Sequence, residues 1–221
     1  MAEQLTFDLP RRVARGRDAF FVAPANRVAL VQIDDWANWP SGKLVLVGPR
    51  GAGKTHMAHV WAATADAHIL AAEALPSEAP EGGHWVVEDI ERIAGDMEAE
   101  EALFHFHNHV LAHDGRLLMT ACDGISNVPF ALPDLASRVA GTTQAQIDRP
   151  DDTLLCVVLV KLFDDRQLTP PAELIPYLAA RIERSISAAD KIVAVLDQAA
   201  LAAKRDLTVR FAGEILDKPD S

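Results

Sequence analysis

Short apolar runs alternate with longer stretches through the first two thirds of the chain. The runs at 43–47, 67–71, 84–87 and 116–120 are continuous in apolar residues, and a weaker run spans 143–147. A continuous apolar run predicts a strand that is buried on both faces, because a strand with one wet face alternates instead. The intervening stretches are long enough for helices. The pattern therefore predicts a doubly wound α/β fold, with a parallel five-stranded sheet and helices on both faces.

The pattern changes at about residue 150, where helical periodicity replaces the strand runs. Four segments follow one another there without an intervening strand pattern: 152–164, 171–184, 187–204 and 209–218. We therefore expect an α/β domain at residues 19–149 and a small all-helical domain at residues 150–221. Residues 1–18 precede both domains as a flexible tail.

The composition is that of a soluble chain with a sizeable core. Of the 221 residues, 49% are hydrophobic, and no apolar run reaches the length of a membrane span. Met1 is followed by Ala, Glu and Gln, so no secretory signal is expected and the cytoplasm is the expected location. Cys122 and Cys156 lie far apart in apolar surroundings, which predicts two buried, reduced thiols.

The net charge of -11 argues against a general nucleic-acid surface. One short basic segment near the N-terminus contains Arg11, Arg12, Arg15 and Arg17. We expect this segment to be a solvated linker, with contact to phosphate or DNA as the alternative. Direct sequence-specific DNA binding and membrane contact are therefore not expected.

The strongest chemical signal is a glycine-rich loop between a predicted strand and a predicted helix. The stretch GPRGAGKTH fits the pattern G-x-x-x-x-G-K-[ST], in which backbone N–H groups wrap phosphates. Lys54 is expected to neutralise the outer phosphate, and Thr55 to offer its hydroxyl to Mg²⁺. The helix N-terminus adds positive charge. The predicted site for ATP or ADP consists of Gly48, Pro49, Arg50, Gly51, Ala52, Gly53, Lys54, Thr55 and His56.

Two carboxylates follow the predicted strand at 84–87. Glu88 and Asp89 are expected at the C-terminal edge of the sheet, where the glycine loop also lies. One can hold Mg²⁺, with Glu88 and Thr55 as the expected metal ligands, and the other can polarise a water. Arg138 closes a short predicted helix and is the candidate for the positive charge that phosphate transfer requires. A solvated acidic pair and a helix-end arginine are the plain alternatives.

Four motifs, in this order and spacing, resemble the AAA+ module of the bacterial replication initiator DnaA. They are GPRGAGKTH, VVEDIERIAG, FHFHN and LPDLASR, at residues 48–56, 86–95, 104–108 and 132–138. LPDLASR after a glycine loop is far more specific than the loop alone. The resemblance covers about residues 20–218 and implies an AAA+ P-loop domain with a helical lid. The initiator carries a further DNA-binding domain after the lid and this sequence ends at Ser221, so we expect a shorter, Hda-like relative that inactivates the initiator.

The resemblance implies a role for each matching residue. Lys54 and Thr55 correspond to the Walker A positions, and Glu88 and Asp89 to Walker B. Arg138 corresponds to an arginine finger, which in this family acts on nucleotide that a neighbouring subunit holds.

Three positions depart from the family pattern. The family usually has Asp where Glu88 stands and a polar sensor residue where Cys122 stands. A sensor arginine is expected in the lid where Asp190 and Lys191 stand, and Arg184 is the nearest arginine. These departures imply a protein that holds nucleotide better than it hydrolyses it.

The stretch QLTFDLP at 4–10 carries large apolar side chains ahead of any predicted element. Leu5, Phe7 and Leu9 need an apolar pocket, and Gln4 can hydrogen-bond at its mouth. In the family that the chain resembles, a short glutamine-containing motif docks on the DNA polymerase sliding clamp, and QLTFDLP is similar to that motif. Packing against the protein's own core is the alternative.

Three histidines in the predicted helix after the acidic pair recur every fourth residue. His105, His109 and His113 therefore share one helical face. Zinc ligation by this face is the alternative to a role in packing, although three ligands along one helix rarely converge on one metal.

Two classes of function remain open. The first is a regulatory interaction protein that holds ADP or ATP, is tethered to the sliding clamp and presents Arg138 to ATP on the initiator DnaA. Such a protein has weak ATPase activity of its own, and homo-oligomers are an open option. The alternative is an autonomous ATPase of the helicase-loader or DNA-remodelling type, which uses Asp89 in its own site.

Overall fold

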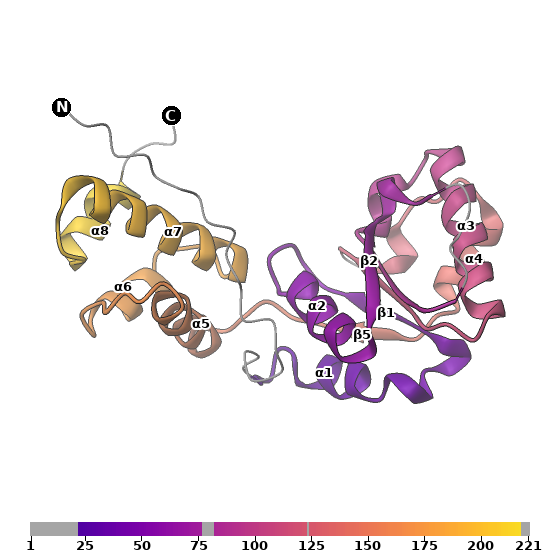
Figure 1. Cartoon of the computed structure of the whole chain (residues 1–221). Coiled ribbons are helices and arrows are strands. Elements are labelled where there is room, and N and C mark those ends of the chain that lie inside the picture. The colour runs from indigo at the N-terminus through magenta and orange to yellow at the C-terminus, as the bar shows by residue number, and fades with distance from the viewer. Residues whose placement is uncertain (1–21, 77–81, 123, 218–221) are drawn as a thin grey trace, which may run out of the picture.

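The computed structural model contains an α/β unit followed by a helical unit (Figure 1). It describes residues 22–76, 82–122 and 124–217, so the QLTFDLP stretch and the basic segment lie outside the described residues. The strands are β1 (Lys43–Val47), β2 (Ala67–Ala71), β3 (His84–Glu88), β4 (Leu117–Ala121) and β5 (Gln144–Gln146). The helices are α1 (Arg27–Asp34), α2 (Lys54–Ala65), α3 (Met97–Ala112), α4 (Pro133–Ala140), α5 (Asp152–Asp164), α6 (Leu174–Ala179), α7 (Ile186–Ala203) and α8 (Val209–Leu216).

The five strands form one parallel sheet in the order β2-β3-β4-β1-β5. β1 lies between β4 and β5, with Lys43 opposite Leu117 and Val47 opposite Ala121. Every residue of β1 and of β4 is buried. The pairing confirms the predicted five-stranded parallel sheet. The burial of its central strands on both faces explains why their sequences are continuous apolar runs.

Alternate residues of β1 belong to two different cores. Val45 and Val47 pack in the core that contains residues of α3 and α4. Leu44 and Leu46 pack in the core that contains residues of α1 and α2. Figure 1 shows the same division, with α1 and α2 on one side of the sheet and α3 and α4 on the other. The strand direction then places the glycine loop, which follows β1, at the C-terminal edge of the sheet.

The helical unit has an apolar core of its own, built from α5, α6, α7 and α8. Three of its helices begin at side-chain caps, where Asp151, Ser185 and Thr208 each accept a hydrogen bond from a backbone N–H three residues later. The segment predicted as a helix over 171–184 is helical only over Leu174–Ala179. The chain turns after α6 so that Ser185 can begin α7. None of the described helices is long and apolar enough to cross a membrane.

Ionisable side chains are buried beside α3, on the side of the sheet that this helix covers. Glu100 is 0% exposed, His107 2% and Lys43 8%. Nε2 of His107 lies 3.1 Å from Nζ of Lys43, and its Nδ1 lies 3.1 Å from Oδ1 of Asn108. Burial, and then the charge of Lys43, lower the pKa of His107 from 6.5 to about 4, so its ring is neutral at pH 7.

The buried His107 predicts that mild acid destabilises the protein. Because its pKa is lowered on folding, the unfolded chain binds the proton first as the pH falls. Its contribution to stability is therefore complete above pH 6.5 and is lost towards about pH 4. The change is at most about 3 kcal/mol. Urea unfolding between about pH 7 and about pH 4 measures it, and His107→Gln should flatten the dependence. The same slope in the variant would contradict this assignment.

Candidate functional site

The glycine loop joins the end of β1 to the start of α2, as the motif requires. Two of its glycines, Gly51 and Gly53, have φ of +74° and +104°, where residues with a Cβ are strained. Gly53 is also the N-cap residue of α2. A Cβ added at Gly51 would lie 2.5 Å from Oγ of Ser185, so the close approach of the helical unit also requires glycine at this position.

Lys54 is the first residue of α2 and is only 7% exposed. Its Nζ donates hydrogen bonds to the carbonyl oxygens of Gly48, at 2.7 Å, and Pro49, at 3.3 Å. It also lies 3.3 Å from Sγ of Cys122, at the end of β4. The amino group is therefore held inside the curve of the loop, where a phosphate bound by the loop would meet it.

A cavity of about 960 Å³ extends from the loop to the helical unit, large enough for a nucleotide. Its lining comes from both units: Arg50, Gly51, Gly53, Lys54, Thr55, His56, His59, Asp89, Glu91, Arg92, Cys122, Leu162, Asp165, Arg166, Ile186, Ser187 and Asp190. Of the predicted loop residues, Arg50, Gly51, Gly53, Lys54, Thr55 and His56 line this cavity.

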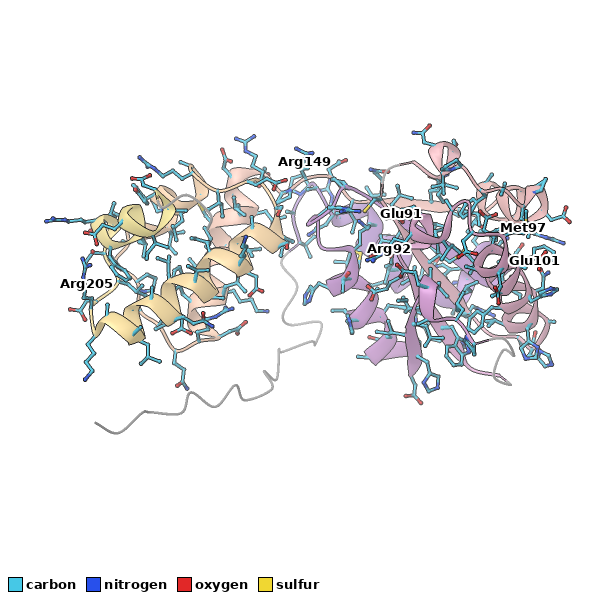
Figure 2. All side chains as sticks on the ribbon, turned by 90° about the horizontal axis from the view of Figure 1, so that it is seen from above. Glu91, Arg92, Met97, Glu101, Arg149 and Arg205 are labelled. Carbon is cyan, nitrogen blue, oxygen red and sulfur yellow. The ribbon has the colours of Figure 1, made fainter. Side chains whose placement is uncertain are left out.

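The helical unit contacts the glycine loop directly. The backbone N–H of Ile186, at the start of α7, donates to the carbonyl oxygen of Gly51 at 2.7 Å. In Figure 2, Glu91 and Arg92 lie in the part of the α/β unit nearer the helical unit, whereas Met97 lies on its far side. The cavity is thus closed on one side by the N-terminal end of α7.

The two predicted carboxylates have different positions. Asp89 lines the cavity, has φ of 55°, and its backbone N–H donates to Oγ1 of Thr120 at 2.9 Å. Glu88 does not line the cavity, and its Oε1 is buried without a hydrogen-bond partner among the described residues. Thr55 lines the cavity and is exposed. Thr55, Asp89 and Glu91 thus line the cavity with oxygen atoms of the kind that Mg²⁺ prefers, and the expected roles of Glu88 and Thr55 as metal ligands stay predictions.

Cys122 is a polar part of this cavity rather than a buried thiol. Both cysteines are free, as predicted, but both are partly exposed, so the prediction that they are buried was wrong. Burial, and then a hydrogen bond with Glu91, raise the pKa of Cys122, so it is a neutral thiol. Sγ of Cys122 and carboxylate oxygens of Asp89 and Glu91 lie within 4.8 Å of one another.

Among the described residues, the two histidines His105 and His109 of α3 and its C-cap residue His113 form no such group of donor atoms. Within residues 22–76, 82–122 and 124–217, the group with ligand atoms this close is the one made by Asp89, Glu91 and Cys122. The rings of His109 and His113 stack with centroids 4.2 Å apart, and Nδ1 of His113 donates to the carbonyl oxygen of His109. His105 and His113 are exposed and His109 is partly exposed, so this face of the helix is largely open to solvent.

Arg166 is a cavity residue that the sequence did not reveal. Its side chain is 9% exposed, and it pairs with Asp190 at 2.8 Å and with the carbonyl oxygen of Leu162 at 3.0 Å. Its Nε is buried and has no hydrogen-bond partner among the described residues. No local motif marks this arginine, since it follows the end of α5. Only the packing of α5 against α7 brings it to the cavity, whereas Arg184 pairs with Asp152 on the surface and does not line it.

Arg138 lies far from this cavity. It is exposed on the last turn of α4, and its carbonyl oxygen accepts a hydrogen bond from Nζ of Lys43 at 3.1 Å. Lys43 is the first residue of β1, whereas the loop begins with Gly48 after the last one. At the rise of a parallel strand, these two residues are about 17 Å apart. Arg138 is therefore at the opposite edge of the sheet from its own glycine loop.

Solved structures with the same architecture include two replication proteins. Domain III of the Thermotoga maritima replication initiation protein DnaA matches with a TM-score of 0.78 and 16% identity, over 96% of this chain and 100% of that one. The replication initiator DnaA bound to AMPPCP and single-stranded DNA matches with a TM-score of 0.68 and 14% identity, over 85% and 67%. The chain has the fold of DnaA domain III.

The same architecture also occurs in a DNA motor. The Thermotoga maritima RuvB Holliday junction branch migration motor matches with a TM-score of 0.66 and 13% identity, over 92% of this chain and 71% of that one. No family model matches the sequence. At such low identities the likeness establishes the fold alone, so the activity has to be argued from the residues of this chain.

The cavity predicts how two basic residues contribute to nucleotide affinity. Lys54→Ala should abolish detectable binding of ADP and ATP, because it removes the charge inside the loop. Arg166→Ala should weaken binding about tenfold, because it removes one charged donor from the side opposite the loop. Titration calorimetry measures both effects. Arg184→Ala, which breaks an exposed ion pair outside the cavity, is the matched control and should bind as wild type does.

Thermal unfolding of the same variants separates lost contacts from lost fold. Arg166→Ala should keep a cooperative transition, since Asp190 is about half exposed and can be hydrated. Wild-type affinity in both Lys54→Ala and Arg166→Ala would show that nucleotide does not bind in this cavity.

Proposed function

We propose that this protein holds an adenine nucleotide in the cavity and acts through Arg138 on ATP that a DnaA-type replication initiator holds. In this role it is an Hda-like regulator that promotes hydrolysis on its partner and so limits replication initiation. The proposal combines the resemblance of LPDLASR and its companion motifs with the position of Arg138 in the fold. An arginine finger supplied in trans stabilises the charge that develops on the transferred phosphate.

The observation that carries the proposal is the separation of Arg138 from its own cavity. An arginine that assists hydrolysis in its own site must reach the outer phosphate. Arg138 is exposed and lies beyond the other end of β1, about 17 Å along the strand from the start of the loop. A side chain of its length cannot reach that far. A bound partner, or a second copy of this chain, is the remaining recipient of its charge.

The residues that line the cavity suit the binding of a nucleotide better than its hydrolysis. Next to Lys54, at the end of β4, stands the neutral thiol of Cys122, and a thiol is a weak hydrogen-bond donor. Such a group orients an attacking water poorly. We infer that ADP or ATP with Mg²⁺ serves mainly to fix the contact between the loop and α7.

The tether is the second part of the proposal. The segment QLTFDLP lies outside the described residues, so its support comes from the sequence. Leu5, Phe7 and Leu9 suit the apolar pockets of a sliding clamp, and Gln4 suits a polar contact at the pocket mouth. Attachment to the clamp would raise the local concentration of Arg138 near replicating DNA.

An autonomous ATPase of the DNA-remodelling type is the second candidate. Two observations favour it: the fold is shared with a branch migration motor, and Asp89 lines the cavity together with Thr55. Steady ATP turnover by the isolated protein distinguishes the candidates. The regulator that we propose should turn over ATP only slowly without its partner.

Arg138→Ala tests the trans mechanism. The variant should keep nucleotide affinity but lose stimulation of initiator-bound ATP hydrolysis, by about 10³-fold if the whole finger effect is lost. Phosphate release from ATP-loaded initiator measures this. Arg210→Ala, at an exposed position on α8, is the matched control and should stimulate normally. Full stimulation by Arg138→Ala would rule out this arginine as the finger.

Gln4→Ala combined with Leu5→Ala tests the tether. If the segment docks on a partner, the double variant should lose binding to the sliding clamp while its melting temperature stays within about 2 °C of wild type. Surface plasmon resonance on immobilised clamp measures the binding. Arg11→Ala with Arg12→Ala, in the same tail, is the control. A large loss of stability with clamp binding retained would mean that the segment packs on its own core.

A further inference from the structure

We propose that α4 is clamped at both ends by buried charged side chains, and that this clamp fixes the direction of Arg138. Glu100 of α3 holds the start of α4, and Lys43 of β1, supported by His107 of α3, holds its end. These three are positioning residues, because they act on the backbone of α4 and not on any substrate. Their role in activity rests on the proposed trans function, whereas their role in holding α4 does not.

The start of α4 is held by a carboxylate. Glu100 accepts hydrogen bonds from the backbone N–H groups of Leu132 at 2.7 Å and Ala131 at 3.0 Å, and from that of Gly95 at 2.7 Å. Leu132 is the N-cap residue of α4, and its own side chain is not a cap. Burial alone would raise the pKa of Glu100, but the three backbone donors outweigh burial and lower it. The group is thus an ionised carboxylate at pH 7.

The end of α4 is held by an amine. The carbonyl oxygen of Arg138 belongs to the last turn, where carbonyl groups lack a partner within the helix. It accepts hydrogen bonds from Nζ of Lys43 at 3.1 Å and from Oγ1 of Thr142 at 2.8 Å. Lys43 is 8% exposed, and its amino group contacts both this carbonyl oxygen and Nε2 of His107. Lys43 therefore binds the backbone of Arg138 itself.

His107 holds Lys43 in place. An ammonium group has no acceptor, so Nε2 of His107 must accept from Lys43 and the ring proton must sit on Nδ1. Nδ1 then donates to Oδ1 of Asn108. This arrangement needs a neutral ring, which the lowered pKa provides. The amino group of Lys43 is thereby held at a buried position by a neutral ring.

The signs of the two charges match the helix they hold. A negative group at a helix N-terminus and a positive group at its C-terminus both stabilise the helix dipole. α4 has only eight residues, and a helix this short is not stable alone in water. Its position and direction therefore depend on tertiary contacts. Since Glu100 and His107 both belong to α3, one rigid helix sets both ends.

Hydrogen exchange on the isolated protein tests the clamp without any partner. Lys43→Met keeps the length and apolar stem of the side chain and removes the donor. The amides of Gly141 and Thr142, which close the last turn of α4, should then exchange at least about tenfold faster. The amide of Val45, in the sheet, should be unchanged. Glu100→Gln should likewise speed the exchange of the amides of Ala131 and Leu132 at the start of α4. Glu101→Gln, at the exposed neighbouring position, is its matched control.

Kinetics on initiator-bound ATP then test the positioning role. Lys43→Met should lower the maximal stimulated rate about tenfold or more, because small displacements of a catalytic group are costly. The concentration for half-maximal stimulation and the affinity for ADP should not change. Lys43→Arg, which retains a donor, should recover part of the rate. A purely structural defect would instead lower the affinity for ADP and the stimulated rate together. Lys43→Arg would then not restore the rate.

The two measurements fail separately. Absence of stimulation by the wild-type protein would refute the proposed function, and the exchange experiment would still decide the clamp. Wild-type exchange of α4 in both Lys43→Met and Glu100→Gln would overturn the clamp, whatever the activity. If Lys43→Met fails to fold, His107→Leu, which removes the acceptor for Lys43, tests the same end of α4 by the same exchange measurement, and unchanged exchange there counts equally against the proposal.

Discussion

The direction of β1 is the constraint on which the rest of this structure depends. All five of its residues are buried, so β1 is linked to polar functional groups at its two ends. The C-terminal end leads into the glycine loop and Lys54, and the N-terminal end supplies Lys43 to the helix that carries Arg138. The glycine loop and the exposed arginine are therefore joined through one buried strand, yet they lie too far apart to act on the same phosphate.

The loop also determines where the helical unit sits. Ser185 is the N-cap of α7, and it packs where a side chain on Gly51 would have to lie. The next backbone N–H, of Ile186, donates to the carbonyl oxygen of Gly51. The start of α7 is thus defined by a contact with the loop rather than by the helical unit alone. A ligand that shifts the backbone of the loop would therefore first move the N-terminal end of α7.

The sequence was informative where one short segment decides the outcome. Five apolar runs predicted five parallel strands, and the glycine motif predicted the strand, loop and helix around Lys54, because local pattern and local structure coincide there. It failed where distant segments meet. Arg166 reaches the cavity only through the packing of α5 on α7, and Glu91, which no motif marked as a site residue, lines the cavity beside Asp89. Burial of Cys122 was misjudged because its apolar neighbours in sequence belong to β4, whereas its side chain faces Lys54.

The charges around the cavity would suit a nucleotide that binds together with a divalent cation. Four basic side chains line it, namely Arg50, Lys54, Arg92 and Arg166. Four acidic side chains line it as well, namely Asp89, Glu91, Asp165 and Asp190. A lining with balanced charge leaves the negative charge of a bound nucleotide uncompensated, unless a cation binds with it. Asp89, Glu91 and Thr55 offer the oxygen atoms that Mg²⁺ prefers, while the thiol beside Lys54 offers no strong donor to a water. A lining suited to a metal–nucleotide complex would thus be poorly equipped to hydrolyse it, in keeping with the proposal that Arg138 acts on nucleotide held elsewhere.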